Sequence, residues 1–364
     1  MNRWGHKVNT VYIMLGTGCN MNCAYCLQHS LVQHPLSKEV NPKIYDFLEA
    51  LSKENKSGKI RLVFYGGEPL LYFSVIREIA EEIRERQISV DYSVITNGRA
   101  LTDEMTEFFC GENFHVTVSW DGYRTRETRR FDVMADPEIR GKILRLPHLC
   151  LSGVISAKAY PMEILEAFQD IADDYEDRNH EKLQVNLDEI FDTGITDKKL
   201  LSVDYDRVSH DMRKLALMYM HLVNGGGYRR EDDAKLMYIS GIIRRLWDFY
   251  VGKDGKWDSS FVSCGNGIRV LNLDLEGNLY PCHNTSESIG DIETPYETYL
   301  ENLKKGDRTR ERRFFCLTCP VLSYCRGGCK LVGDKARNET YCKLKRALIE
   351  PVLQVIRTYG GETA

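Results

Sequence analysis

The stretch Cys19-Asn-Met-Asn-Cys23-Ala-Tyr-Cys26 places three cysteines on one short segment, spaced Cys-x3-Cys-x2-Cys. The run before it, residues 8–15, is rich in β-branched and apolar side chains, which predicts a buried strand that ends at Gly16-Thr-Gly18. We therefore expect the cysteines in the loop that follows this strand. Three thiolates on one loop can hold three irons of a 4Fe–4S cluster and leave the fourth iron without a protein ligand. A structural zinc site is the alternative, but it needs four ligands and usually shows two-by-two spacing.

This cysteine pattern, with the aromatic Tyr25 directly before the third cysteine, resembles the signature of the radical S-adenosylmethionine (AdoMet) enzymes. The resemblance implies that Cys19, Cys23 and Cys26 hold a catalytic 4Fe–4S cluster whose open iron chelates AdoMet. The reduced cluster of such enzymes cleaves AdoMet to a 5′-deoxyadenosyl radical, while the protein supplies position and electrostatics. A flavodoxin- or ferredoxin-type protein would be the reductant.

Composition sets broad limits on the class of protein. The length of 364 residues suggests two or three domains. The net charge of −4, from 49 basic and 53 acidic residues, gives no support to a nucleic-acid partner. The N-terminus has no apolar signal region, and no segment reaches the ~18 apolar residues that span a membrane, so we expect a cytoplasmic protein without a membrane partner. Twelve cysteines in that compartment indicate metal or iron–sulfur ligation rather than disulfides.

Strand-like and helix-like segments alternate through the first 190 or so residues. The expected strands cover residues 8–15, 59–65, 89–95, 114–119, 149–156 and 183–187, and helical patterns cover 41–51, 74–86, 102–109 and the segment from Pro161. Strands separated by helices imply a parallel sheet with right-handed crossovers. We expect an α/β fold with a partial (βα)6 TIM-type barrel.

The ends of these strands carry unusual loops: Gly66-Gly-Glu-Pro69, Thr96-Asn-Gly98 and Ser119-Trp-Asp-Gly122. Barrel enzymes build their sites from loops at this rim. The resemblance implies AdoMet contacts from Tyr25, Gly66, Gly67, Glu68, Thr96, Asn97 and Ser119. In this interpretation the glycines allow close backbone approach and Glu68 accepts from the ammonium of AdoMet.

Three further charged residues follow the fourth expected strand. Asp121 is expected to order its own loop. Arg129 and Arg130 fall where radical AdoMet enzymes often have an arginine.

Seven cysteines between Cys264 and Cys342 form a second pattern: Cys264, Cys282, Cys316-x2-Cys319-x5-Cys325-x3-Cys329 and Cys342. The pattern resembles the SPASM extension of radical AdoMet enzymes, which holds two auxiliary 4Fe–4S clusters, so three clusters are expected in all. The resemblance assigns Cys316, Cys319, Cys325 and Cys342 to one cluster, and Cys264, Cys282 and Cys329 to the other. Residues 265–281 contain no cysteine, so the second cluster should have an open iron or take another ligand. A zinc ribbon is the alternative for the first set alone.

These motifs divide the chain into a radical AdoMet barrel (1–195), a helical bridge (196–260) with helices near 204–223 and 232–250, and a SPASM domain (261–364).

Other candidate residues have ordinary explanations beside functional ones. His283 could transfer protons at neutral pH, or make a structural hydrogen bond. Surface positions are expected for His29 and His34. Asp188 and Glu189 could face the barrel mouth, but helix capping or solvent exposure is the favoured interpretation. Cys110 and Cys150 are expected to be buried, inert thiols.

The predicted function is a peptide-modifying maturase that abstracts hydrogen from a peptide and forms a thioether or carbon–carbon cross-link, or a related oxidation, as in the biosynthesis of ribosomally made peptides. Because the barrel begins almost at residue 1, leader recognition would need a separate protein or another surface. A substrate cysteine could bind the open auxiliary iron and become a thioether. The alternatives are a sulfatase-type maturase, a small-molecule dehydrogenase and, in another class, an iron–sulfur electron-transfer protein.

Overall fold

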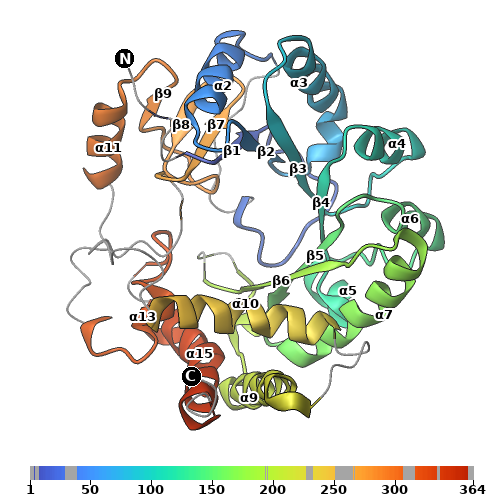
Figure 1. The fold of residues 1–364 in the computed structure, drawn as a ribbon, viewed down its shortest axis with the longest axis vertical. Coiled ribbons are helices and arrows are strands. Elements are labelled where there is room, and N and C mark those ends of the chain that lie inside the picture. The colour runs from blue at the N-terminus through green and yellow to red at the C-terminus, as the bar shows by residue number, and fades with distance from the viewer. Residues whose placement is uncertain are drawn as a thin grey trace.

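A single curved sheet of nine strands forms the centre of the computed structural model, in the order β6-β5-β4-β3-β2-β1-β7-β8-β9 (Figure 1). The structure describes residues 4, 8–28, 39–192, 194, 196–226, 233–250, 265, 267–305, 316–333 and 337–359. The strands are β1 (Thr10–Met14), β2 (Ile60–Tyr65), β3 (Val90–Thr96), β4 (His115–Ser119), β5 (Cys150–Ile155), β6 (Gln184–Glu189), β7 (Val270–Asp274), β8 (Asn278–Tyr280) and β9 (Gly290–Asp291).

Strands β1 to β6 are the six predicted from sequence, each within two residues of the expected ends. Every neighbouring pair from β1 to β6 is parallel. In the described sheet β6 pairs only with β5, whereas β1 pairs with β2 and β7. The barrel is therefore open, which confirms the partial (βα)6 architecture.

Helices cover the outer face of the barrel strands (Figure 1). They are α2 (Lys43–Glu54), α3 (Phe73–Glu85), α4 (Asp103–Gly111), α6 (Pro137–Ile143) and α7 (Pro161–Asn179). Helix α3 shows why: Phe73, Ile76, Ile79 and Ile83 recur at helical spacing and are all buried against the sheet. Short elements on the loops between them are η1 (Pro69–Tyr72), η2 (Gly122–Arg124) and α5 (Thr125–Arg129).

The two faces of the barrel strands differ in chemistry. On β4 and β5, Val116, Val118 and Leu151 are fully buried under the outer helices. The alternating residues on the other face, such as Thr117 and Ser152, line a cavity inside the barrel. This alternation gives the barrel an apolar outer layer and a polar interior.

The predicted bridging helices are present as α9 (Tyr205–His221) and α10 (Asp233–Tyr250), preceded by α8 (Lys198–Leu201) and joined by η3 (Leu222–Gly226). Helix α9 packs along the C-terminal helix α15 (Cys342–Tyr359), and α10 lies beside β6 (Figure 1). No helix in the described ranges is long and apolar enough to cross a membrane.

The C-terminal region continues the barrel sheet rather than forming a separate one. Strand β7 pairs in parallel with β1, with Val11 opposite Leu271, and β8 and β9 follow as antiparallel strands. Its remaining described elements are α11 (Tyr296–Lys305), α13 (Leu322–Cys325) and η6 (Arg337–Tyr341). The sequence did not indicate this pairing, and the three domain boundaries remain a prediction.

Candidate active site

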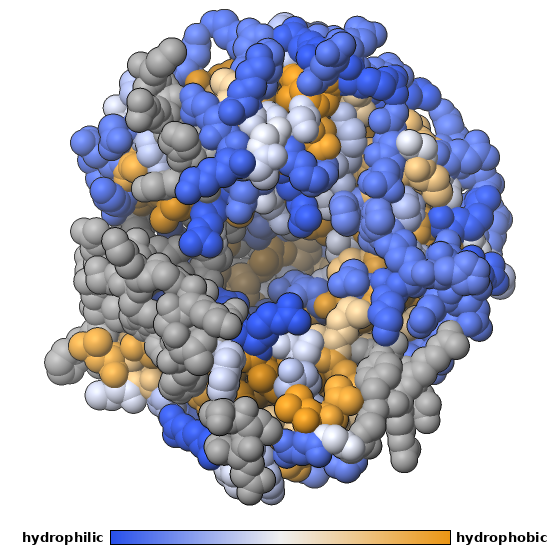
Figure 2. Space-filling view, in the orientation of Figure 1, coloured by the Kyte–Doolittle hydropathy of each residue, from blue (hydrophilic) through white to orange (hydrophobic). Residues whose placement is uncertain are grey.

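A cavity of ≈ 630 Å³ opens at the C-terminal ends of the barrel strands. Figure 2 shows the hollow near the centre of this face, inside the curve of β1 to β6. All ten residues for which the sequence predicted catalytic-cluster ligation or AdoMet contact line it: Cys19, Cys23, Tyr25, Cys26, Gly66, Gly67, Glu68, Thr96, Asn97 and Ser119. The structure thus brings four loops of the sequence to one place, while the role of each residue remains a prediction.

The three cysteines lie in the loop directly after β1, as expected. The amide of Met21 donates to Cys19 Sγ at 3.4 Å, and Asn97 Nδ2 approaches the same sulfur at 3.7 Å. Burial raises the pKa of the Cys23 thiol to about 11. Without metal this thiol is protonated at neutral pH, so binding of iron would release a proton.

Glycines in the loop after β2 permit close packing on the cysteine loop. The amides of Gly67 and Glu68 donate to the carbonyls of Gly16 and Gly18, both at 2.8 Å. A Cβ at Gly67 would lie 2.3 Å from Gly18 O, which is far too close for a non-bonded contact. The expectation from sequence was approach to a ligand; the structure adds that these glycines dock one loop on the other.

Glu68 fastens the β2 loop to the β3 loop. Its Oε1 accepts from Thr96 Oγ1 at 2.5 Å and Leu70 N at 3.0 Å, and its Oε2 accepts from Asn97 N at 2.7 Å. Burial raises the pKa of this carboxyl, and the three hydrogen bonds oppose the rise. An ionised carboxylate has about four acceptor positions, so about one remains for the predicted ammonium contact.

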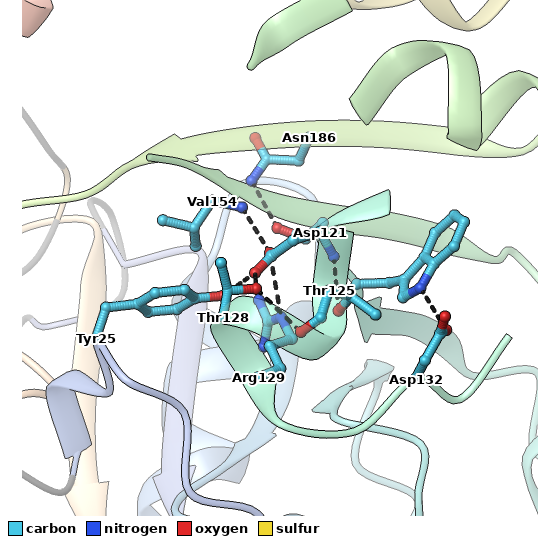
Figure 3. Close-up of polar contacts among 10 residues, drawn as sticks. Tyr25, Asp121, Thr125, Thr128, Arg129, Asp132, Val154 and Asn186 are labelled. Atoms are coloured by element: carbon cyan, nitrogen blue, oxygen red, sulfur yellow. Dashed lines mark hydrogen bonds and ion pairs between the residues drawn. The ribbon is translucent and has the colours of Figure 1, made fainter. Parts of the chain in front are cut away.

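Asp121 is the centre of a buried network that connects the cysteine loop to β4 and β5 (Figure 3). Its Oδ2 accepts from Tyr25 Oη at 2.5 Å and Thr128 Oγ1 at 2.6 Å. Its Oδ1 accepts from Arg129 Nε at 3.1 Å and Val154 N at 2.9 Å. Burial alone would lower the pKa of Arg129, but Asp121, together with Tyr25 and Cys23, more than offsets this and the pKa is raised. The expectation that Asp121 orders only its own loop was too narrow.

The two arginines after β4 differ in position. Arg129 lines the cavity, and its guanidinium lies 5.5 Å from the centre of the Tyr25 ring. Arg130 is exposed and follows α5 in a left-handed conformation, with φ of 70°. Only Arg129 is therefore positioned to act inside the cavity.

Residues of the C-terminal region complete the cavity wall. His283 stacks on Tyr12, with ring centres 4.7 Å apart, and meets Tyr65 edge-on. Its Nδ1 lies 3.2 Å from Asn272 Oδ1, and burial lowers its pKa to about 4, so the ring is neutral at pH 7. The cysteine loop reaches this region through Gln28 Nε2, which donates to the carbonyl of His283 at 2.7 Å.

The predicted auxiliary ligands fall in two places. Cys329 lines the cavity, and Cys264 lies outside the described residues. Burial raises the pKa of Cys342, and the nearby Cys316 and Cys319 raise it further. Burial likewise raises the pKa of Cys325 to about 11. Cys342 and Cys319 also contribute to the raised pKa of Cys325. The four thiols predicted for one cluster therefore lie close to one another.

Among the described residues, no three His, Cys, Asp or Glu side chains lie close enough together to hold a single metal ion.

The residues with ordinary expected roles differ in outcome. Asp188 lines the cavity and is exposed there, so it faces the barrel mouth and does not cap a helix, and Cys150 lines the cavity as a half-buried thiol. Glu189 pairs with Lys345 of α15. Cys110 is exposed, so the expectation of burial was wrong. His29 and His34 lie outside the described residues.

Comparisons with known proteins agree with this geometry. Residues 13–145 match the model of the radical SAM superfamily. The radical SAM cyclopropyl synthase TigE of Paramaledivibacter caminithermalis is 21% identical over 97% of this chain and 76% of its own length. A cysteine-type anaerobic sulfatase-maturating enzyme of Clostridium perfringens is 22% identical over 92% of this chain and 93% of its own.

Solved structures show the same fold. The structure described as native anSMEcpe with bound AdoMet has a TM-score of 0.65 at 17% identity, covering 98% of this chain and all of the other. The same protein with AdoMet and the Cp18Cys peptide gives 0.64 at 16% identity, with 98% of this chain and 99% of the other covered.

The open parallel barrel and the cysteine loop at its rim define a radical SAM domain. By residues 13–145 the chain belongs to the radical SAM superfamily, its relatives include maturases, and the resemblance seen in the sequence is confirmed. Membership implies a 4Fe–4S cluster and AdoMet.

The residues present fit these two groups. Three thiols on one loop face a cavity whose volume, ≈ 630 Å³, is within the range of about 300–1,000 Å³ typical of small-molecule sites. Gln28 lines the cavity, and its buried Oε1 has no hydrogen-bond donor in the described part of the chain. A bound ligand with an amine or hydroxyl could supply that donor.

Proposed function

We propose that this protein is a radical SAM maturase that modifies a peptide or protein side chain, by forming a cross-link (thioether or carbon–carbon) or by a related oxidation. The observation that carries the proposal is one cavity between two cysteine-rich segments. Cys19, Cys23 and Cys26 lie on one wall, and Cys329 lies on another. Such a cavity can receive a substrate segment between a radical source and a second redox centre.

In this proposal Cys19, Cys23 and Cys26 hold the catalytic cluster. When bound, the reduced cluster and AdoMet supply a carbon-centred radical that removes a hydrogen atom from the substrate. The protein holds the loops around AdoMet in place: Glu68 fixes the β3 loop through Asn97 N, and Asp121 fixes Tyr25. Thr96, Asn97 and Ser119 provide polar contacts from the same rim.

The C-terminal cysteines are proposed to hold two auxiliary clusters, with Cys316, Cys319, Cys325 and Cys342 on one and Cys264, Cys282 and Cys329 on the other. The second set adjoins the cavity through Cys329. Cys282 also lies close enough to Tyr12 and Tyr65 to raise the pKa of both, after the larger effect of burial. A cluster held by these residues would supply an electron acceptor beside the cavity.

A peptide substrate is supported by the relatives. The names of four of them describe sulfatase maturation, and a solved structure with the same fold is described with a bound peptide. A sulfatase-type maturase is therefore the second candidate function. Leader recognition by a separate protein and reduction by a flavodoxin or ferredoxin remain part of the proposal.

The test uses the anaerobically reconstituted protein, reductant, AdoMet and short peptides encoded beside its gene. The proposal expects 5′-deoxyadenosine and a peptide product lighter by two hydrogens. Modification of a sulfatase peptide instead would support the second candidate. Reduction of the clusters without AdoMet cleavage would mark an electron carrier and overturn both.

A further inference from the structure

The inner wall of the cavity at β5 and β6 is polar and carries two carboxylates, Asp188 and Glu189. Parallel pairing places Val154 opposite Asp188 and Ser152 opposite Asn186, so their side chains share one face. All four residues line the cavity. Asn186 Nδ2 donates to Ser152 Oγ and to Asp188 Oδ2, both at 3.1 Å.

Asp188 and its neighbour Glu189 differ in their partners. Glu189 forms an ion pair with Lys345, whose ammonium lies 5.7 Å and 5.8 Å from the rings of Tyr324 and Tyr341. Asp188 accepts one hydrogen bond, from Asn186, and its Oδ1 has no donor in the described part of the chain. One carboxylate is therefore used by the fold, and the other is left with an open acceptor in the cavity.

The charged groups around Asp188 do not neutralise it by contact. Lys345 on α15 is paired with Glu189, and Arg129 on α5 is paired with Asp121. The other titratable neighbours are Tyr12 (β1), Tyr65 (β2), Cys150 (β5) and Tyr238 (α10); burial raises the pKa of each, so they are uncharged at neutral pH.

Asp188 is exposed in the cavity, and no cationic side chain among the described residues contacts its carboxylate. A ligand that brings a positive charge to the open Oδ1 would form a charge-assisted hydrogen bond there. Hydrogen bonds to charged groups contribute about 1.5–3 kcal/mol each, more than neutral ones.

We propose that Asp188, oriented by Asn186, forms a binding subsite for a cationic side chain, lysine or arginine, of the substrate peptide. The proposal rests on the proposed function, because it assumes that a peptide occupies the cavity. It adds a specificity that the family likeness does not supply: the residue entering beside β6 carries a positive charge.

The subsite has a defined pH dependence. Desolvation by the protein around the cavity, followed by the charge of Glu189, raises the pKa of Asp188 to about 6 from the usual 3.8. A cation binds the ionised form, so the preference should be full above pH 7 and should fall as the pH drops through about 6. Lysine and arginine keep their charge over this pH range, so a change in the preference would come from titration of the protein and not of the peptide.

The experiment measures binding of acetylated Gly-Gly-Xaa-Gly-Gly amides to the holoprotein with AdoMet by calorimetry, where Xaa is lysine, arginine, norleucine or glutamate. At pH 7.5 the lysine and arginine peptides should bind about tenfold or more tightly than the norleucine peptide, as one charged hydrogen bond predicts. Asp188→Asn should abolish this difference. Glu81→Gln removes one charge from an exposed position on α3 and should preserve it.

Three results would overturn the proposal: equal binding of norleucine and lysine peptides, a preference that survives in Asp188→Asn, or no binding of either cationic peptide. Repeating the wild-type comparison at pH 5 needs no variant, and an unchanged preference there is a fourth such result. These measurements involve no turnover. If the cationic preference is absent while AdoMet is still cleaved and a peptide modified, only the subsite is wrong.

Discussion

Removing the carboxylate of Asp121 should destabilise the protein more than any exposed ion pair would. Asp121 is 1% exposed and Arg129 is 8% exposed, so the substitution Asp121→Ala leaves a buried guanidinium without its partner. It also removes the acceptor of Tyr25 Oη and Val154 N. The substitution therefore breaks the hydrogen bond that joins Tyr25 of the cysteine loop to the loop after β4.

The magnitude follows from these contacts. Breaking a buried ion pair on one side costs about 3–5 kcal/mol, and each orphaned buried donor costs about 1–3 kcal/mol. Arg129 and Tyr25 border the cavity, where water can replace part of the loss. We therefore expect a decrease of about 3 kcal/mol in the free energy of unfolding. Tyr25→Phe removes a single donor to Asp121 and should cost about 1 kcal/mol.

Urea unfolding of the anaerobic protein, followed by circular dichroism, measures both variants. The double variant Asp121→Ala with Arg129→Met removes both charges, and should recover most of the loss because no buried charge is left alone. A loss below about 1 kcal/mol for Asp121→Ala would refute this reasoning. If the losses caused by Asp121→Ala and by Arg129→Met alone simply add up in the double variant, the reasoning is refuted as well.

Two further substitutions test the packing of the site. Gly67→Ala should displace the cysteine loop, because its Cβ would meet Gly18 O at 2.3 Å. The amount of iron bound per chain after reconstitution should therefore fall. The control is Gly141→Ala, whose Cβ would have nothing within 4 Å, and this variant should bind as much iron as the wild type. Lys345→Met leaves Glu189 unpaired where their side chains are 14% and 21% exposed, and should lower the free energy of unfolding by about 3 kcal/mol, measured in urea.

The control for the lysine substitution is Lys53→Met, which breaks a pair with Glu49 whose side chains are 71% and 36% exposed. Exposed pairs contribute about 0–1 kcal/mol. Equal effects of the two lysine substitutions would contradict the interpretation of Lys345. Equal iron loss in both glycine variants would contradict the packing argument.

The sequence predicted the barrel because its information is local. Apolar runs, their alternation with helical segments, and glycine-rich loops such as 66–69 all lie within a few residues of one another. The cysteine spacing was likewise readable without a structure. The rim loops were identified as candidates for the same reason.

Contacts between distant segments could not be predicted in this way. The pairing of β1 with β7 joins Val11 to Leu271, and no local pattern specifies that partner. The roles of Glu68 and Asp121 depend on donors that other loops supply. Asp188 was different: alternation along β6 places it on the face of Asn186, and its position at the end of the sixth strand already allowed it to face the barrel mouth.

The measurement that tests the central claim most directly is the formation of 5′-deoxyadenosine from AdoMet by the reduced, reconstituted protein. The wild-type chain should form it. The variant with Cys19, Cys23 and Cys26 all changed to alanine should form none, and should lose about one 4Fe–4S cluster of iron while the remaining clusters stay bound. Continued cleavage of AdoMet by this triple variant would contradict the assignment of the catalytic cluster to this loop.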